Sequence, residues 1–418
     1  MMRARDLVVA AVAALALLVQ PAFGSAQQDV ELAGRDRVVD LQATELYNVG
    51  SMDGADWEVF ASVSEVAFDA DGNLFVLDGG NQRVVVLGPD GGHVRTIGRR
   101  GGGPGEFLSP AAMAVTAGGE LVVYDRGRRA YSVFEADGTF RENLPTDIVR
   151  DGGMPGTNLQ AHPRNGFAVD FISMDVDTGD PATSRQDGGH VPIQWRSLEQ
   201  GAAPQEIFRV DRIGPRPSMV ARPGEMSVQI GGRMPAFTPT LNWGVLPSGG
   251  AAFFQTTEYA VTVVGPTGEV ERVLRRPIEP RGVAGRDEDD ERDRRWADFD
   301  AGGGPQIRMV ENDRELDTSA ERRRIFEQMM AQLEFAEVIP VLANMAVDRA
   351  GRLWIQRTGR RVTEEGPVDI ATADGEYLGT LEGITLPDAF GPGGRVVFVE
   401  TDELGVPKVS VKRWQIQG

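Results

Sequence analysis

The chain holds few residues of the types that usually carry catalysis or hold a transition metal. It has no cysteine and only three histidines, His93, His162 and His190, which stand in different local contexts. Zinc sites are built from closely spaced Cys and His ligands, so this pattern disfavours one. A Gly-x-Ser-x-Gly nucleophile elbow is also missing. The sequence therefore predicts no catalytic residues and no metal ligands.

Two short segments resemble ion-binding loops but are better explained otherwise. Asp69-Ala-Asp-Gly-Asn73 begins like a calcium loop, but it lacks the downstream bidentate Glu and runs into a strand-like sequence. The Gly-rich stretch 98–105 leads into a Pro and further strand-like sequence, rather than into the helix N-terminus that usually binds phosphate. We interpret them as a hairpin turn and a link, in which Arg99 and Arg100 are candidates to bind an anionic group.

An internal repeat shows which elements would position such residues. Phe68–Asp78 aligns with Val115–Asp125, and the turn Asp90-Gly91 aligns with Asp137-Gly138, each after a shift of 47 positions. A period in this range, built from short strands and Gly turns, is typical of a β-propeller, whose blades are four-stranded antiparallel sheets. We name the strands of a blade a to d, with strand a nearest the axis.

Related strand patterns later in the chain predict six blades, at 65–98, 111–146, about 166–196, 243–274, 345–381 and about 384–414. The sixth blade lacks a fourth strand, whereas the strand-like stretch Arg37–Tyr47 precedes the first blade without a partner. We predict that Arg37–Tyr47 supplies this outer strand and closes the ring, which removes exposed sheet edges. The expected fold is an all-β six-bladed propeller, a single domain over residues 27–418.

The first residues have the pattern of a secretory signal peptide. Arg3 and Arg5 precede an apolar run of 13 residues from Leu7 to Val19, and Gly24-Ser-Ala26 offers a small-residue cleavage site. The run is too short to span a hydrocarbon core of ~30 Å. We expect residues 1–26 to be removed and the mature protein, without a membrane span, to be periplasmic or extracellular.

The formal net charge of −19 disfavours general nucleic-acid binding, because such a surface repels phosphate backbones. The charge is typical of a soluble exported protein. We expect a monomer whose partner is a protein or a small-molecule ligand, and we predict no cofactor for it.

The turn Asp78-Gly-Gly-Asn81-Gln-Arg83 resembles the NHL repeat, whose b–c turn commonly reads Asp, two spacers, Asn, spacer, Arg. The link from Thr96 to Phe107, followed by Pro110, is also similar to the NHL linker. The second blade departs from the pattern, with Arg-Gly-Arg128 after Asp125. The resemblance to exported bacterial six-bladed propellers implies a scaffold, usually with a binding role, and it assigns no catalytic residue.

Strand order predicts that one face of the disc carries the function. The b–c loops and the d–a links lie on one face, and the a–b and c–d turns lie on the other. All long connecting segments are b–c loops or d–a links: 98–110, 175–190, 211–240 and 275–342. Function tends to reside in loops on a rigid scaffold, so we place any site on this loop-bearing face. The candidate binding residues are Asp78, Asn81, Arg83, Arg99, Arg100, Asp125 and Arg128.

The longest link, between blades four and five, contains a helical insertion at about 286–338. Thr318-Ser-Ala-Glu321 fits a capping box, and Ile325, Met329 and Leu333 follow with helical spacing, which predicts a helix over 319–338. The charged run 286–295 is interpreted as a solvated loop. The helix either packs on the propeller rim or forms a lid over the central channel.

Two functions stay open at this point. The first is a non-catalytic binding or interaction module, which the weakness of every catalytic motif favours. The alternative is a metal-assisted hydrolase or lyase, similar to a lactonase, that acts at the central channel. A propeller lactonase takes oxygen ligands from several blades, so its site leaves no local motif, and calcium would be its cofactor.

Overall fold

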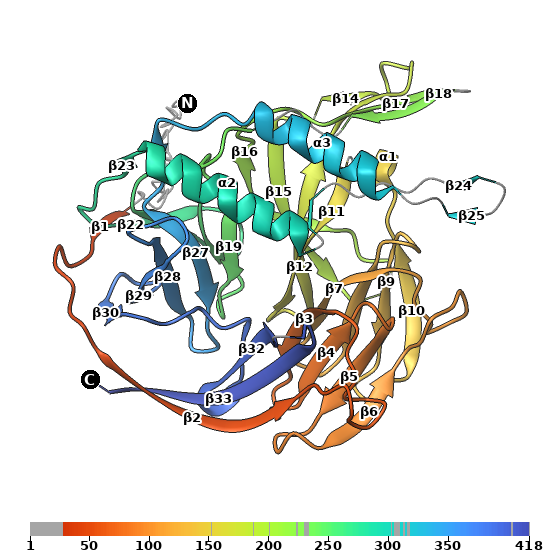
Figure 1. The fold of residues 1–418 in the computed structure, drawn as a ribbon. Coiled ribbons are helices and arrows are strands. Elements are labelled where there is room, and N and C mark those ends of the chain that lie inside the picture. The colour runs from red at the N-terminus through yellow and green to blue at the C-terminus, as the bar shows by residue number, and fades with distance from the viewer. Residues whose placement is uncertain are drawn as a thin grey trace, which may run out of the picture.

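The computed structural model describes residues 28–151, 153–186, 188–199, 201–222, 225–229, 234–301, 303–304, 310–311, 314–315, 318–402 and 404–417. The predicted signal peptide at 1–26 lies outside them. Six sheets stand around a common axis, five with four strands and the fourth with five, which confirms the predicted six-bladed propeller (Figure 1).

The first two blades follow the repeat closely. The first consists of β3 (Val63–Phe68), β4 (Leu74–Asp78), β5 (Arg83–Leu87) and β6 (His93–Ile97), and the second of β7 (Pro110–Val115), β8 (Leu121–Asp125), β9 (Ala130–Phe134) and β10 (Phe140–Pro145). The repeated turn glycines Gly72 and Gly119 have φ of 88° and 85°, in the left-handed region that only glycine adopts readily. Strands b are wholly buried because neighbouring blades cover both of their faces.

The third and fourth blades have the same strand order. The third consists of β11 (Gly153–His162), β12 (Gly166–Ser173), β15 (His190–Ser197) and β16 (Gln205–Asp211), and the fourth of β19 (Asn242–Val245), β20 (Ala251–Phe254), β21 (Ala260–Val264) and β22 (Val270–Arg275). A fifth strand, β1 (Gln28–Glu31), pairs in parallel with the outer strand β22 of the fourth blade.

The N-terminal strand closes the ring, as predicted. The fifth blade consists of β27 (Leu342–Val347), β28 (Arg352–Thr358), β29 (Glu365–Thr372) and β30 (Tyr377–Leu381), and the sixth of β31 (Ala389–Phe390), β32 (Arg395–Thr401) and β33 (Pro407–Gln417). The closing strand β2 (Asp40–Val49) pairs antiparallel with β33. Sequence reasoning placed this strand a few residues too early, at 37–47.

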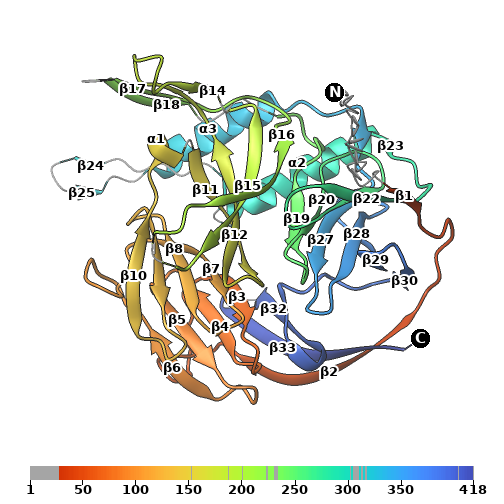
Figure 2. The same ribbon diagram turned by 180° about the vertical axis from the view of Figure 1, so that it is seen from behind.

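Residues 28–39, which we call the N-terminal lace, run along the outside of the ring before β2 begins (Figure 2). β1 lies on the fourth blade and Val38 forms a parallel bridge with Thr380 on the fifth. The lace therefore joins the fourth and fifth blades at their outer edges and leads into β2 on the sixth, an arrangement that the sequence did not predict.

The hydrophobic core is divided among the interfaces between blades. One cluster of buried side chains fills each of the six interfaces; the first and sixth blades, for example, meet through Val85 and Val397. Burial of apolar surface contributes roughly 25 cal/mol per Å². Every blade therefore depends on two neighbours, and closing the ring buries the last interface.

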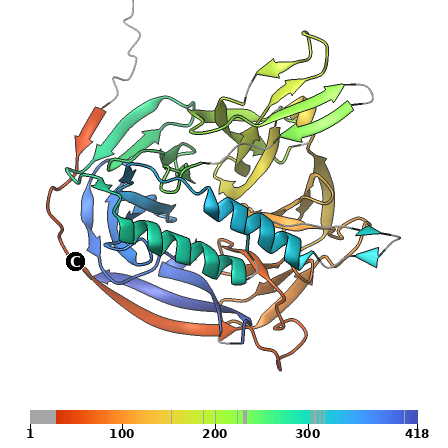
Figure 3. The ribbon, with the colours of Figure 1, turned by 45° about the horizontal axis from the view of Figure 1, so that its top comes forward.

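The loop-bearing face carries the additional elements. These are α1 (Ile148–Asp151), a four-stranded sheet of β13 (Asp175–Asp177), β14 (Arg185–Gln186), β17 (Ser218–Arg222) and β18 (Glu225–Gln229), the pairs β23 (Arg281–Gly282) with β26 (Val338–Ile339) and β24 (Val310–Glu311) with β25 (Arg314–Glu315), and the helices α2 (Gly285–Asp300) and α3 (Ser319–Ala331). On the opposite face, η1 (Pro392–Gly394) forms an a–b turn. The helices cross the middle of the ring side by side rather than lying at its rim (Figure 3).

The helical insertion corrects two predictions. The charged run 286–295, which was expected as a solvated loop, lies within α2, because ion pairs three and four residues apart, such as Glu291 with Arg294 and Arg295, stabilise the helix. The helix α3 begins where predicted but ends at Ala331. Its N-cap residue Thr318 makes no side-chain capping hydrogen bond, and Glu321 pairs with Arg324 instead.

Candidate functional site

The predicted site residues of the first blade form a clamp, the blade-one clamp of Asp78, Asn81 and Arg83. The fully buried Asp78 carboxylate accepts hydrogen bonds from the backbone N–H groups of Ala61 (3.1 Å) and Ser62 (3.2 Å), from Asn81 Nδ2 (2.7 Å) and from Arg83 Nε (3.1 Å). Asn81 and Arg83 also donate to backbone carbonyls of the same link, at Val59 and Asp56. Their polar groups are thus used to hold the link that enters the blade.

The second blade contains an equivalent clamp of Asp125 and Arg128. Asp125 is fully buried and accepts hydrogen bonds from the backbone N–H groups of Leu108 (2.7 Å) and Ser109 (2.8 Å). Arg128 donates to the carbonyl of Glu106 (2.9 Å). It thus binds the backbone of the preceding link, as Arg83 does in the first blade, but from a different position in the turn. A binding role for these clamp residues stays a prediction, and the structure gives them an internal role in positioning links.

Arg99 and Arg100 lie on the link between the first two blades. Arg99 is 81% exposed and its Nε donates a hydrogen bond to Glu106 Oε1 (2.9 Å). Arg100 Nε donates to Gln82 Oε1 (2.9 Å). Each guanidinium has a partner among the described residues, and anion binding by this pair also stays a prediction.

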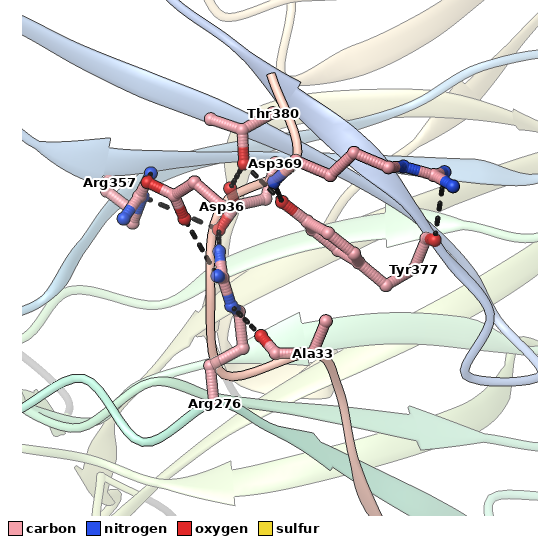
Figure 4. A network of polar contacts seen from close by, with 8 residues as sticks. Ala33, Asp36, Arg276, Arg357, Asp369, Tyr377 and Thr380 are labelled. Carbon is pink, nitrogen blue, oxygen red and sulfur yellow. Dashed lines mark hydrogen bonds and ion pairs between the residues drawn. The ribbon is translucent and has the colours of Figure 1, made fainter. Parts of the chain in front are cut away.

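A second buried network, which we call the latch, lies where the lace crosses from the fourth to the fifth blade (Figure 4). Arg276 is 1% exposed and forms ion pairs with Asp369 (2.7 Å) and Asp36 (2.8 Å). Arg357 Nη2 also pairs with Asp36 (2.8 Å), and Thr380 Oγ1 donates to Asp369 (2.6 Å). Arg276 Nε donates to the carbonyl of Ala33 (2.9 Å), so the lace, the fourth blade and the fifth blade are joined through one arginine.

A pocket of about 540 Å³, the blade-five cavity, opens beside the latch. Its lining includes the buried apolar residues Ile339 and Val341. Its walls come from the b–c loop of the fifth blade and from two d–a links, as predicted for a site on the loop-bearing face; they are residues 278–281, 339–341, 357–360, 364–367, 382 and 383, with Asp36 of the lace.

Carboxylates outnumber guanidiniums on the walls of this cavity. Asp36, Glu279, Glu364, Glu365 and Glu382 face Arg281, Arg357 and Arg360. Arg357 is bound within the latch, and Arg281 pairs with Asp287 of α2 (2.8 Å). The hydrogen bond from Arg281 holds the pKa of Asp287 below its usual range. Within the described part of the chain, four charged side chains of the lining make no hydrogen bond or ion pair: the carboxylates of Glu279, Glu364 and Glu382 and the guanidinium of Arg360.

A pair of carboxyl groups lies near the axis of the ring. Glu65 belongs to the innermost strand of the first blade, and Asp388 precedes the innermost strand of the sixth. Burial, followed by the negative charge of Asp388, raises the pKa of Glu65 to about 8. Burial also raises the pKa of Asp388, whose Oδ2 accepts a hydrogen bond from the backbone N–H of Val399 (2.7 Å).

Sequence reasoning found neither the latch nor the blade-five cavity. Arg276 and Asp36 are separated by 240 residues, so no local pattern could join them. Glu65 did offer a signal, as the one charged residue of the strand Val63–Phe68. Among the described residues, no group of three or more His, Cys, Asp or Glu side chains is placed to hold a metal ion, and no helix is both long and apolar enough to cross a membrane.

Comparisons with known proteins agree on the class of fold. Residues 56–159 match a family model described as a 6-bladed beta-propeller. The comparison with curated proteins gave no match. The chain is a six-bladed β-propeller protein; the narrower resemblance to the NHL repeat stays a prediction.

Several solved propellers are similar in chain course. A member of the DUF4221 family from Bacteroides vulgatus is 10% identical, with 94% of this chain and 99% of that chain covered and a TM-score of 0.46. A gluconolactonase from Xanthomonas campestris is 15% identical (94% and 97% covered, TM-score 0.40), and a virginiamycin B lyase from Staphylococcus aureus is 8% identical (90% and 99% covered, TM-score 0.42). Similarity at this level says nothing about the activity of this chain.

Proposed function

We propose that this protein is an exported, non-catalytic binding protein whose ligand occupies the blade-five cavity, and that the ligand is a cation with an apolar body. The observation that carries the proposal is a lining that combines the buried apolar residues Ile339 and Val341 with carboxylates, Glu279 and Glu382 among them, that have no partner among the described residues. The signal-peptide pattern before Gln27 supports export.

The chemistry of the cavity favours a cationic ligand over an anionic one. A carboxylate without a partner interacts favourably with an incoming positive charge, whereas an anion would meet several negative charges. Ile339 and Val341 supply the apolar contact that orients such a ligand. The volume of the cavity lies within the range of small-molecule sites, roughly 300–1,000 Å³.

The proposal is tested with three small probes of one shape. Benzamidine, benzamide and benzoate carry a positive, zero and negative charge on the same ring, and their binding is measured by calorimetry. We expect benzamidine to bind most tightly, and each of Glu279→Gln and Glu382→Gln to weaken its binding about three- to tenfold, since one close charge pair contributes roughly 1 kcal/mol.

The matched control is Asp71→Asn, in an exposed a–b turn on the opposite face. It removes one negative charge without touching the cavity and should leave benzamidine binding unchanged. Equal binding of the three probes, no binding of benzamidine, or equal weakening by the control would each contradict the proposal.

The axial pair of Glu65 and Asp388 favours a second candidate, a hydrolase or lyase that acts at the channel, because a carboxyl group that titrates near neutral pH can serve as general acid or base. The test is turnover of a panel of lactones with and without calcium, by the natural chain and by Glu65→Gln. Turnover that Glu65→Gln abolishes would establish this candidate and displace the binding protein.

A further inference from the structure

A second hollow, which we call the blade-six groove, lies in the wedge between the fifth and sixth blades. Its volume is about 700 Å³. It is lined by residues 38–41, Ala43, 381–386, Asp388, 398–400, Lys412 and Trp414. The lace, the link between the two blades and strands of the sixth blade therefore all contribute to it.

The groove has an aromatic wall that already holds a cation. The rings of Phe398 and Trp414 lie with their centroids 5.5 Å apart, and Lys412 Nζ lies 4.9 Å from the centroid of Phe398. The face of an aromatic ring attracts a positive charge through its quadrupole. Lys412 thus shows that the face of Phe398 accepts an ammonium group.

The rim of the groove is acidic. The lining residues include four with carboxylates, Asp40, Glu382, Asp388 and Glu400, and one with a positive charge, Lys412. Within the described residues, the side chains of Asp40, Glu382 and Glu400 make no hydrogen bond or ion pair. Like the blade-five cavity, the groove combines apolar contact with unpartnered negative charge.

The two hollows are neighbours, because Glu382 and Gly383 line both of them. Each hollow alone has the size of a small-molecule site, and the two together exceed that range. A single small cation would fill only one of them, whereas an extended chain that crosses the link at Glu382 and Gly383 would reach both.

We infer that the blade-five cavity and the blade-six groove form one continuous trough for an extended basic peptide, with one cationic side chain in the cavity and another over Phe398. This inference rests on the proposed function of the cavity and extends it from a small cation to a peptide segment. Charge complementarity selects the partner: both ends of the trough offer carboxylates that have no partner among the described residues, and lysine or arginine side chains spaced along a peptide match them.

The test compares a labelled eight-residue peptide of alternating lysine and alanine with its glutamate counterpart, with spermine and with benzamidine. Binding is measured by fluorescence anisotropy or by displacement of the labelled peptide. We expect the lysine peptide to bind at least tenfold more tightly than benzamidine, and the glutamate peptide not to bind.

Three variants test whether the blade-six groove forms the second end of the trough. Phe398→Leu keeps an apolar side chain but removes the ring, and should weaken peptide binding about fivefold, as expected for one cation–π contact, while benzamidine binding stays unchanged. Lys412→Met removes the internal cation and should strengthen peptide binding about threefold. The matched control is Lys408→Met on the same strand; Lys408 pairs with Asp402, lies outside the groove lining, and should have no such effect.

The outcomes separate this inference from the proposed function. If benzamidine binding depends on Glu279 but the peptide gains nothing over benzamidine, the cavity is a small-cation site and the trough is wrong. If spermine binds as tightly as the peptide, or if Lys408→Met strengthens binding as much as Lys412→Met, recognition of a peptide is also wrong. If neither benzamidine nor the peptide binds, both proposals fall.

Discussion

The blade-one clamp and the latch use the same chemistry at very different separations along the chain. In the clamp, the buried Asp78 bonds Arg83, five residues on, and the backbone of Ala61, 17 residues back. In the latch, the buried Asp369 pairs with Arg276 across 93 residues, and Arg276 pairs with Asp36 across 240. A local network leaves a motif in the sequence, whereas a long-range one does not.

The two networks also differ in how deeply their arginines are buried. Arg83 is 16% exposed, and Arg276 is 1% exposed. If the carboxylate partner of Arg83 is lost, water can still solvate the Arg83 guanidinium. The guanidinium of Arg276 is too deeply buried for that. Loss of one partner from a buried pair is costly because it leaves an uncompensated charge. The latch should therefore be the more sensitive of the two.

The largest effect is expected for Asp369→Ala. The variant leaves Arg276 buried with Asp36 as its remaining carboxylate, and should lower the free energy of unfolding by about 3–5 kcal/mol. Chemical denaturation measures the loss, and hydrogen exchange should show faster exchange along the lace. The control is Asp374→Ala, which breaks the pair with Arg272; because Asp374 is 89% exposed, it should lose about 1 kcal/mol or less. If Asp369→Ala and Asp374→Ala lowered the free energy of unfolding equally, burial of the latch would not explain its contribution to stability.

An intermediate effect is expected for Asp78→Ala in the clamp. The backbone N–H groups of Ala61 and Ser62 lose their acceptor, which should lower the free energy of unfolding by about 2–3 kcal/mol. Hydrogen exchange should accelerate at residues 56–62 and not in the lace. Asp125→Ala should lower the free energy of unfolding to a similar extent and accelerate hydrogen exchange at residues 108–109. If only one of the two variants lost stability, the two clamps would not contribute equally to the stability of the fold.

The smallest effect, and a pH-dependent one, is expected for Asp36→Ala. Burial alone would raise the pKa of Asp36, but hydrogen bonds from Arg357 and Arg276 outweigh it and hold that pKa below its usual range. A lowered pKa in the folded state means that the carboxylate stabilises the fold above its unfolded pKa, near ~3.9, and that this contribution is lost as the pH falls through the folded value.

The difference in stability between the natural chain and Asp36→Ala should therefore be about 1 kcal/mol at pH 7, because the side chain is 35% exposed, and should shrink below about pH 4. Urea denaturation at several pH values measures it. A difference that stays constant down to pH 2 would show that Asp36 acts through packing rather than through its charge.

Sequence reasoning recovered the parts of the fold that repeat. The strands, the turn glycines such as Gly72 and the closure of the ring by the N-terminal strand followed from period and strand count. The helix α2 was missed because its stability comes from charge pairs such as Glu291 with Arg295 and from stacking of Phe299 on Phe326 of α3, a contact that local hydropathy does not reveal. The blade-five cavity was missed because its lining combines a b–c loop, two d–a links and Asp36 of the lace, which only the folded ring brings together, although the loop-bearing face was predicted.

The sequence by itself determined the propeller, its number of blades and the face that bears the long loops, because strand spacing and turn chemistry are local properties that repeat in every blade. Only the tertiary structure decided that Asp78 and Asp125 serve as clamps, that the lace is held by Arg276, and that Glu382 lines both the blade-five cavity and the blade-six groove. Those features depend on which segments the ring brings together, and closure sets that proximity for residues hundreds of positions apart.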